Sequence, residues 1–291
     1  MSETIIELKH LKKYYGKAKG IEDISLKINK GDIYGFIGPN GSGKSTTIRT
    51  ILSLINKTSG EIYIKNKKID KIDTETKKII GYLPSEINLY NDMTVKQIFD
   101  YHESFYEKNI NNNRKKLVKL FKIDENKLIE DLSLGNLKKI GIILALMHEP
   151  EILILDEPTS GLDPIMQSIF HELLLKEKEK GTTIIYSSHI LSEVSNICDR
   201  VGFIKDGKII KEDYIESIRK KNYTYLKIKS KEKEKIKQDL KLKIINETKN
   251  EISLMNNYDS NKLIKILSKY DIEKILIEEI SLEDLFLNYY K

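Results

Sequence analysis

A glycine-rich loop between an apolar run and a helix-like segment constrains this chain more than any other feature. The apolar run covers residues 33–37, the loop residues 38–46 and the helix-like segment residues 47–52. Glycines let the backbone wrap closely around phosphates, and a helix N-terminus presents unpaired N–H groups. Lys44 adds a positive charge, and Ser45 can place its hydroxyl on Mg²⁺. The segment predicts a site for a nucleoside triphosphate, bound by Gly38, Pro39, Asn40, Gly41, Ser42, Gly43, Lys44, Ser45 and Thr46.

Two adjacent carboxylates, Asp156 and Glu157, follow a second apolar run at residues 151–155. A buried parallel strand would deliver them to the C-terminal edge of a sheet, where such sheets bind ligands. We expect Asp156 to hold Mg²⁺ through water and Glu157 to polarise an attacking water molecule. A carboxylate pair after a strand is otherwise often a helix cap. The phosphate loop upstream favours catalysis over that alternative.

In these motifs the chain resembles the nucleotide-binding subunit of an ATP-binding-cassette (ABC) transporter. The resemblance covers roughly the first three quarters of the chain, with motifs in the family's order and spacing. Residues 38–46 match the Walker A loop, residues 152–156 the Walker B strand and Glu157 the catalytic glutamate. The resemblance implies an α/β phosphate-loop NTPase with antiparallel β and α-helical subdomains. It also implies that ATP and Mg²⁺ are the cofactors. Lys44 is implied to be part of the catalytic site.

Two further side chains match the family's ATP site. Tyr15, followed by Gly16, resembles the aromatic residue that stacks on adenine, although a tyrosine beside a glycine is more often ordinary packing. His189 matches the switch histidine. It follows the predicted strand at residues 182–187, and from that edge it can donate to a γ-phosphate oxygen. A lone histidine is otherwise usually a satisfied surface or core residue.

The remaining motifs point to a dimer. Residues 132–136, with Ser133 and Gly135, stand in the place of the family signature Leu-Ser-Gly-Gly-Gln. Ser133 also fits the N-cap of a helix over residues 137–148. In the family both roles coexist, because that helix N-terminus faces the phosphate bound by the opposite subunit. Asp163 belongs to a loop that crosses the dimer interface. The resemblance implies a homodimer, or a heterodimer with a related ATPase subunit, formed on ATP binding.

The chain departs from the family pattern at three positions. Ser85 stands where the family has a glutamine that reaches the metal, and its shorter stem makes direct contact with Mg²⁺ doubtful. Glu86 or a bridging water is the alternative for that contact. Leu134 replaces the first signature glycine and Asn136 the glutamine. We expect a working but altered site, and a regulatory subunit that hydrolyses ATP slowly is the alternative.

Composition limits where the protein can be located and which partners it can have. A single cysteine, Cys198, excludes a disulfide framework and fits a reducing compartment. No apolar stretch of the sequence approaches the length of a membrane span, so transport would require a polytopic permease subunit. We expect a cytoplasmic protein, peripheral on the inner face of the cell membrane. The net charge of +6 comes from lysines dispersed among acidic residues, which favours a solvated surface over a nucleic-acid groove.

The chain is expected to form two domains. Residues 1–220 would be the nucleotide-binding domain, with strands at residues 4–10, 21–28 and 61–65, a helix-rich segment at 86–147 and a hairpin turn at Asp206-Gly207. Residues 221–291 follow the order strand, helix, two strands, helix, strand. This order predicts a small α+β unit of the ferredoxin-like kind. A terminal helix from Ser281 would resemble the ending of exporter ATPases of the bacitracin- and lantibiotic-resistance kind.

The interpretation is therefore an ATP-hydrolysing subunit that dimerises on ATP and powers a separate permease, for export of a drug, peptide or lipid-like substrate. The alternative is a soluble ABC ATPase that acts on ribosomes or DNA, although such proteins normally carry two cassettes or a long coiled coil. A phosphate-loop GTPase would need Asn-Lys-x-Asp, and residues 126–129 lack the aspartate.

Overall fold

The computed structural model describes residues 3–106, 110–220, 224–248 and 250–279, which divide into two compact units. The first unit ends at Ile215 and the second begins at Glu216. The division falls within α8 (Ile215–Lys220), a few residues before the predicted boundary after residue 220.

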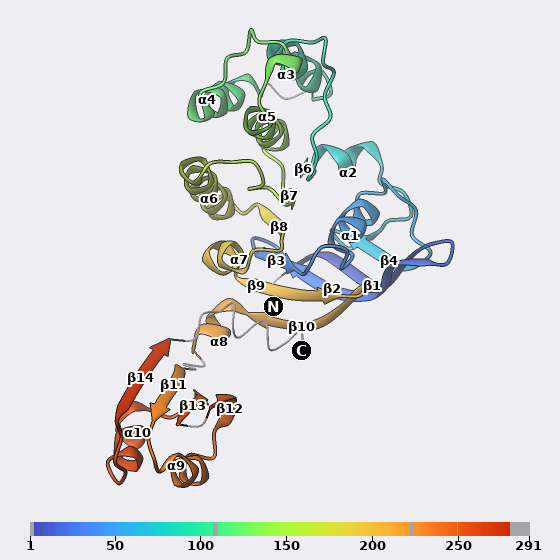
Figure 1. Cartoon of the computed structure of the whole chain (residues 1–291). Coiled ribbons are helices and arrows are strands. Elements are labelled where there is room, and N and C mark those ends of the chain that lie inside the picture. The colour runs from blue at the N-terminus through green and yellow to red at the C-terminus, as the bar shows by residue number, and fades with distance from the viewer. Residues whose placement is uncertain (1–2, 107–109, 221–223, 249, 280–291) are drawn as a thin grey trace. The chain divides into compact units, whose positions relative to one another are not determined.

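The first unit is built on one sheet with the strand order β5-β4-β1-β2-β10-β9-β3-β8-β7-β6 (Figure 1). Strands β9, β3, β8, β7 and β6 pair in parallel, and every residue of β3, β7 and β8 is buried. Such apolar runs are typical of parallel strands covered on both faces. The strands are β1 (Thr4–Tyr15), β2 (Ala18–Asn29), β3 (Ile33–Ile37), β4 (Ser59–Ile64), β5 (Lys67–Lys68), β6 (Ile80–Leu83), β7 (Ile152–Asp156), β8 (Thr183–Ser188), β9 (Arg200–Lys205) and β10 (Lys208–Tyr214).

The other half of the sheet contains the antiparallel strands that the sequence predicts. β1 pairs with β2 and β4, and both β1 and β2 run for 12 residues, longer than the alternating segments predict. β9 and β10 form the predicted hairpin, with both turn residues in the left-handed region, Asp206 at φ 50° and Gly207 at φ 74°. This backbone matches the twist of paired strands, so the tight turn is favoured.

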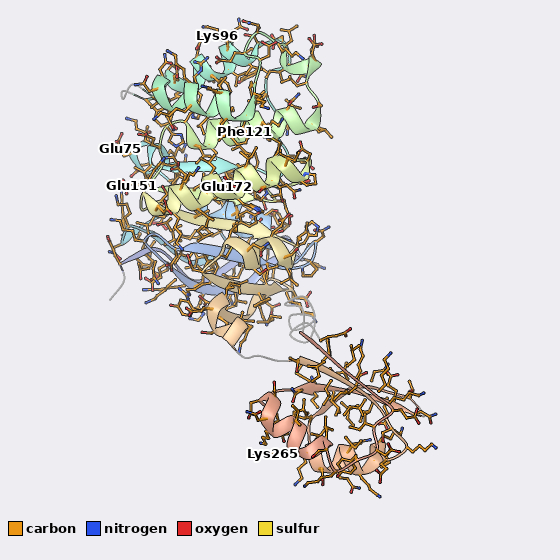
Figure 2. All side chains as sticks on the ribbon, turned by 90° about the vertical axis from the view of Figure 1, so that its left-hand side faces the viewer. Glu75, Lys96, Phe121, Glu151, Glu172 and Lys265 are labelled. Atoms are coloured by element: carbon orange, nitrogen blue, oxygen red, sulfur yellow. The ribbon has the colours of Figure 1, made fainter. Side chains whose placement is uncertain are left out.

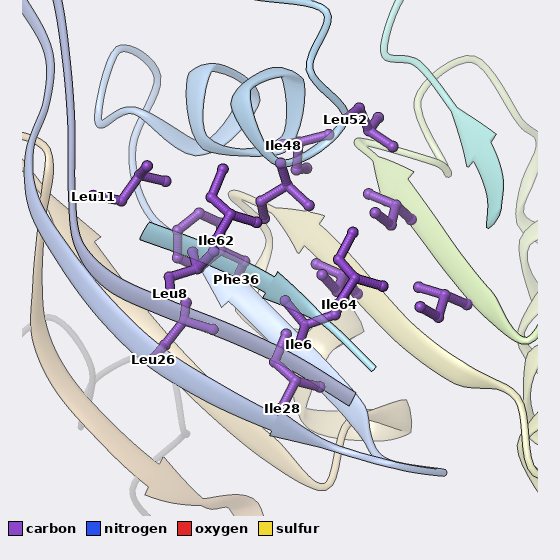
Figure 3. Close-up of a cluster of buried hydrophobic side chains, with 14 of the residues drawn as sticks. Ile6, Leu8, Leu11, Leu26, Ile28, Phe36, Ile48, Leu52, Ile62 and Ile64 are labelled. Carbon is purple, nitrogen blue, oxygen red and sulfur yellow. The ribbon is translucent and has the colours of Figure 1, made fainter. Parts of the chain in front are cut away.

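A cluster of buried aliphatic side chains fixes the helix that follows the phosphate loop. This helix is α1 (Lys44–Ile51), and its Ile48 is fully buried. Figure 3 shows Ile48 and Leu52 with Phe36 of β3 and side chains from the antiparallel strands, which are Ile6, Leu8, Leu11, Leu26, Ile28, Ile62 and Ile64. Each fully buried aliphatic side chain stabilises the fold by about 1.5–3 kcal/mol. The start of α1, and with it the phosphate loop, is therefore held by the core.

The remaining helices of the first unit are α2 (Thr74–Lys78), α3 (Val95–Glu103), α4 (Asn111–Phe121), the 3₁₀ turn Ile129–Asp131, α5 (Leu134–Leu146), α6 (Pro164–Glu179) and α7 (Leu191–Ile197). Thr94 caps α3 in a capping box with Gln97. Phe121 is buried at the end of α4, while Lys96 pairs with Asp100 on α3 (Figure 2). The buried Arg114 of α4 forms ion pairs with three carboxylates, those of Asp100, Glu103 and Glu125. These pairs join α3 and α4 to the loop after α4.

Helix α5 begins three residues before the predicted start at residue 137. The reason is Ser133, whose Oγ accepts a hydrogen bond from the N–H of Asn136 at 3.4 Å. An N-cap at this position makes residues 134–136 the first turn of the helix. The segment that resembles the family signature is therefore helical from Leu134 onward.

The second unit has the predicted order of elements. Its strands are β11 (Thr224–Lys229), β12 (Lys243–Glu247), β13 (Glu251–Asn256) and β14 (Lys274–Glu279), and its helices are α9 (Lys233–Leu240) and α10 (Ser260–Leu267). The antiparallel sheet has the order β12-β13-β11-β14, and it shares one core with both helices. This order, with the two central strands coming first and third in the unit, is that of a ferredoxin-like fold.

The helices that the structure describes include none with the length and apolar character required to cross a membrane. The terminal helix predicted from Ser281 lies outside the described residues.

Candidate functional site

A cleft of about 370 Å³ opens at the loop between β3 and α1. It is lined by Tyr15, Lys19, Gly20, Asn40, Gly41, Ser42, Gly43, Lys44, Ser45, Thr46, Ser85 and Glu157. The structure thus brings together the predicted phosphate loop, aromatic residue, metal-loop serine and carboxylate. Lys19 and Gly20 were not predicted.

Hydrogen bonds from Lys44 to the backbone of the phosphate loop hold that loop in its conformation. Lys44 is 5% exposed, and its Nζ donates to the carbonyl oxygens of Gly38 at 2.7 Å and Pro39 at 3.3 Å. Gly43 caps α1 with φ 108°, and a Cβ there would lie 2.6 Å from the carbonyl oxygen of Gly20. Only glycine combines this backbone with such a close approach. The conformation of the loop is therefore held by contacts within the chain.

Tyr15 ends β1 at the rim of the cleft and is half exposed. A Cβ at Gly20 would lie 3.0 Å from both Tyr15 Cε2 and Thr46 Cγ2. The missing side chain of Gly20 therefore lets the tyrosine ring lie close to the phosphate loop. No local pattern signals this role, because Gly20 and Thr46 meet only through the fold.

Asp156 ends β7 and is fully buried. Its Oδ1 accepts from Ser187 Oγ at 2.6 Å, and its Oδ2 has no hydrogen-bond partner among the described residues. A buried acceptor without a partner is costly, which points to a ligand that completes it. Mg²⁺ prefers oxygen ligands, so the free carboxylate oxygen, together with the hydroxyl of Ser45 in the cleft, fits this ion.

Glu157 follows Asp156 with φ 49°, in the left-handed region. For a residue other than glycine this costs on the order of 1–3 kcal/mol, and such strain concentrates at functional sites. The backbone is held by its N–H, which lies 3.2 Å from both the carbonyl oxygen and the Oγ of Ser187. The carboxylate contacts two candidate catalytic groups, Lys44 Nζ at 3.4 Å and His189 Nδ1 at 2.8 Å.

A buried carboxylate connects the loops that carry Glu157 and His189. Glu193 of α7 accepts hydrogen bonds from three hydroxyls, Thr159 Oγ1 at 2.8 Å, Tyr186 OH at 3.1 Å and Ser188 Oγ at 3.0 Å. Thr159 follows Glu157 by two residues, and Ser188 precedes His189. The network therefore fixes the two loops relative to each other. Sequence reasoning missed Glu193, because a charged helix residue is usually solvated.

Ser85 reaches the cleft on the loop after β6, and its backbone is tied to α5. Lys138 of α5 donates from Nζ to the carbonyl oxygens of Ser85 at 3.0 Å and Pro84 at 3.4 Å. Lys138 is 4% exposed. Burial lowers the pKa of its ammonium, and the carboxylates of Asp156 and Glu157 act in the opposite direction. Lys138 was also missed from the sequence.

Five predicted nucleotide-binding residues do not line the cleft of this chain: Gly38 and Pro39 at the start of the phosphate loop, and Ser133, Gly135 and Asp163 on two other loops. Ser133 caps α5, and Asp163 caps α6 by accepting from the N–H of Met166 at 2.9 Å. A Cβ on Gly135 would lie 2.9 Å from the carbonyl oxygen of Gly161, so the two loops that carry these residues are in contact. Neither of these two loops contributes to the lining of the cleft.

The arrangement agrees with comparisons to known proteins. The ABC transporter family matches residues 21–160. The bacitracin transport ATP-binding protein of Bacillus licheniformis is 35% identical over 98% of this chain and 96% of its own length. This chain is an ATP-binding subunit of the ABC transporter family. The lantibiotic transport ATP-binding protein of Streptococcus pyogenes is 37% identical over 72% of this chain and 90% of its own.

A solved dimeric ATP-binding cassette in a post-hydrolysis state, bound to ADP and Pi, shares the ABC fold with the chain. Its TM-score is 0.66 at 26% identity, and the match covers 72% of this chain and 99% of the cassette. The present ABC subunit is therefore an ATPase. The contacts of Glu193 and Lys138 are features of this ABC subunit that its motifs alone do not reveal.

Proposed function

We propose that this subunit hydrolyses Mg-ATP in the cleft, with Glu157 as the group that activates water. The observation that carries the proposal is the Glu157 carboxylate, which lines the cleft and contacts Lys44 and His189. The water oxygen forms a bond to the γ-phosphorus, the bond to the bridging oxygen breaks, and Glu157 takes up the proton of the water. His189 donates to a γ-phosphate oxygen.

Lys44 Nζ lies 3.4 Å from the carboxylate of Glu157, the group proposed to activate water. Phosphate oxygens carry more negative charge than one carboxylate, so ATP draws Lys44 away from Glu157 and frees that carboxylate for catalysis. The backbone N–H groups of residues 41–46 bind the phosphates together with Lys44, and Tyr15 stacks on adenine.

Ser45 and Asp156 are proposed to hold Mg²⁺, which when bound neutralises charge on the phosphate oxygens. Ser85 lines the same cleft and would contact the ion through a water molecule. Its hydroxyl stands on a short stem, and its carbonyl is tied to Lys138, which keeps the loop in place.

Ser85→Gln is expected to leave ATP affinity within about threefold of the wild type, because Lys44 and the loop backbone dominate that affinity. The longer amide can reach the metal site, so the rate of hydrolysis should change. Equilibrium binding and steady-state hydrolysis measure the two effects separately. A large loss of ATP affinity in Ser85→Ala would contradict the water-mediated role.

A second copy, or a related ATPase subunit, is proposed to complete the ATP site. Ser133, Gly135 and Asp163 lie outside the cleft of their own chain, and the neighbouring Leu134 and Ile165 are 80% and 70% exposed. An apolar surface beside a helix N-terminus suits a partner that presents bound phosphate. ATP would close this dimer, and loss of the γ-phosphate contacts would release it.

A membrane permease is proposed as the other partner, at the cytoplasmic side of the membrane. Support comes from an exposed aromatic cluster on α3 and the loops before and after it. Tyr90, Tyr101 and Phe105 are each at least half exposed, with ring centroids 6.4 Å apart for the first pair and 5.0 Å for the second. Exposed aromatic clusters are typical of protein interfaces. Export is proposed because the bacitracin and lantibiotic relatives are named as transport proteins.

Purification of the tagged subunit from solubilised membranes tests this partner. We expect a polytopic membrane protein to copurify, and the double variant Tyr101→Ala, Phe105→Ala to lose most of it while retaining ATP hydrolysis. Leu54→Ala, which removes a side chain that is 60% exposed elsewhere in the first unit, is the control. Recovery of ribosomes or DNA without a polytopic protein would instead support the soluble ABC ATPase.

A further inference from the structure

Lys138 is a buried, charged side chain, and burial of a charge costs free energy. It lies in the first half of α5 (Leu134–Leu146), and it is 4% exposed. Its Nζ donates to two backbone carbonyls, and no described carboxylate forms an ion pair with it. A buried ammonium without a paired carboxylate destabilises a fold relative to an apolar side chain of similar size.

The two carbonyls that Lys138 binds belong to Pro84 and Ser85. These residues lead from β6 into the loop that lines the ATP cleft. The bonds of Lys138 therefore join this loop to α5, whose first turn carries Ser133 and Gly135. The two hydrogen bonds join residues that lie 54 and 53 positions apart in the sequence.

We propose that Lys138 is a positioning residue for ATP hydrolysis, which ties the Ser85 loop to helix α5 within one subunit. These hydrogen bonds make the loop at the ATP cleft and the signature turn move together as one rigid unit. Lys138 touches neither the reacting atoms nor the metal site. Its side-chain hydrogen bonds hold the backbone of Ser85 in position, and the serine lines the cleft.

Lys138→Met tests the proposal, because methionine keeps the length of the side chain and removes its charge and donors. We expect kcat for ATP hydrolysis to fall at least about tenfold, with KM for ATP within about threefold of the wild type. The thermal midpoint should equal or exceed that of the wild type, since a buried charge is removed. Hydrogen exchange in residues 85–87 should become faster, because the loop has lost its tie.

Lys115→Met is the matched control, since Lys115 is an exposed lysine on α4 of the same helical region. It should leave kcat, thermal midpoint and exchange at residues 85–87 unchanged. A wild-type kcat in Lys138→Met would overturn the proposal. A reduced kcat with unchanged exchange of the loop would overturn it as well. A lowered thermal midpoint with wild-type kcat would assign Lys138 a purely structural role.

Discussion

Glu157→Gln is expected to lower kcat for ATP hydrolysis by at least about 100-fold, the usual contribution of a positioned general base. The amide keeps the size of the side chain and an acceptor for His189, but it cannot take the proton of the attacking water. The purified variant should therefore bind Mg-ATP and accumulate an ATP-bound dimer. Single-turnover hydrolysis and size-exclusion chromatography with Mg-ATP measure these two results.

The same variant should bind ATP at least as tightly as the wild type. The Glu157 carboxylate lies 3.4 Å from Lys44 Nζ and would compete with phosphate for it. Glutamine removes this competition and the repulsion between carboxylate and γ-phosphate. Glu151→Gln is a suitable control, because Glu151 precedes the same strand and pairs with Lys65 away from the cleft. Hydrolysis at the wild-type rate in Glu157→Gln would refute its role as the base.

The parts of the site that were predicted from the sequence depend on neighbours in the chain. The phosphate loop lies between a buried strand and a helix, and residues 38–46 contain the whole pattern. Asp156 and Glu157 follow an apolar run that is a fully buried strand. The Ser133 cap and the Asp206-Gly207 turn are equally local. Each depends on backbone geometry within a few residues, so the sequence alone contains the signal.

The parts that were missed depend on residues brought together by the fold. Because Gly20 has no side chain, Tyr15 can lie beside the phosphate loop. The β1–β2 hairpin brings these residues together. Lys138 and Glu193 are charged, and from sequence such residues are expected on solvated helix faces. Their burial is explained by acceptors and donors far along the chain, carbonyls after β6 for Lys138 and the Thr159 hydroxyl after β7 for Glu193. No periodic pattern contains that information.

Lys44→Ala is expected to weaken ATP binding by about 100-fold. The ammonium would make charge-assisted hydrogen bonds to phosphate oxygens, each contributing about 1.5–3 kcal/mol, and 1.4 kcal/mol corresponds to a factor of ten. Alanine also leaves the carbonyl oxygen of Gly38 without its 2.7 Å hydrogen bond, which loosens the loop. Titration with a fluorescent ATP analogue in the presence of Mg²⁺ gives the affinity directly.

The two predictions separate binding from chemistry at one site. Lys44 and Glu157 contact each other, yet their loss should have opposite effects on ATP affinity. Lys44→Ala removes a partner of the phosphates, and Glu157→Gln removes a competitor for that partner. Lys65→Ala controls for the loss of a lysine, because Lys65 is exposed and pairs with Glu151 outside the cleft. Wild-type ATP affinity in a folded Lys44→Ala protein would show that the loop backbone alone binds the phosphates.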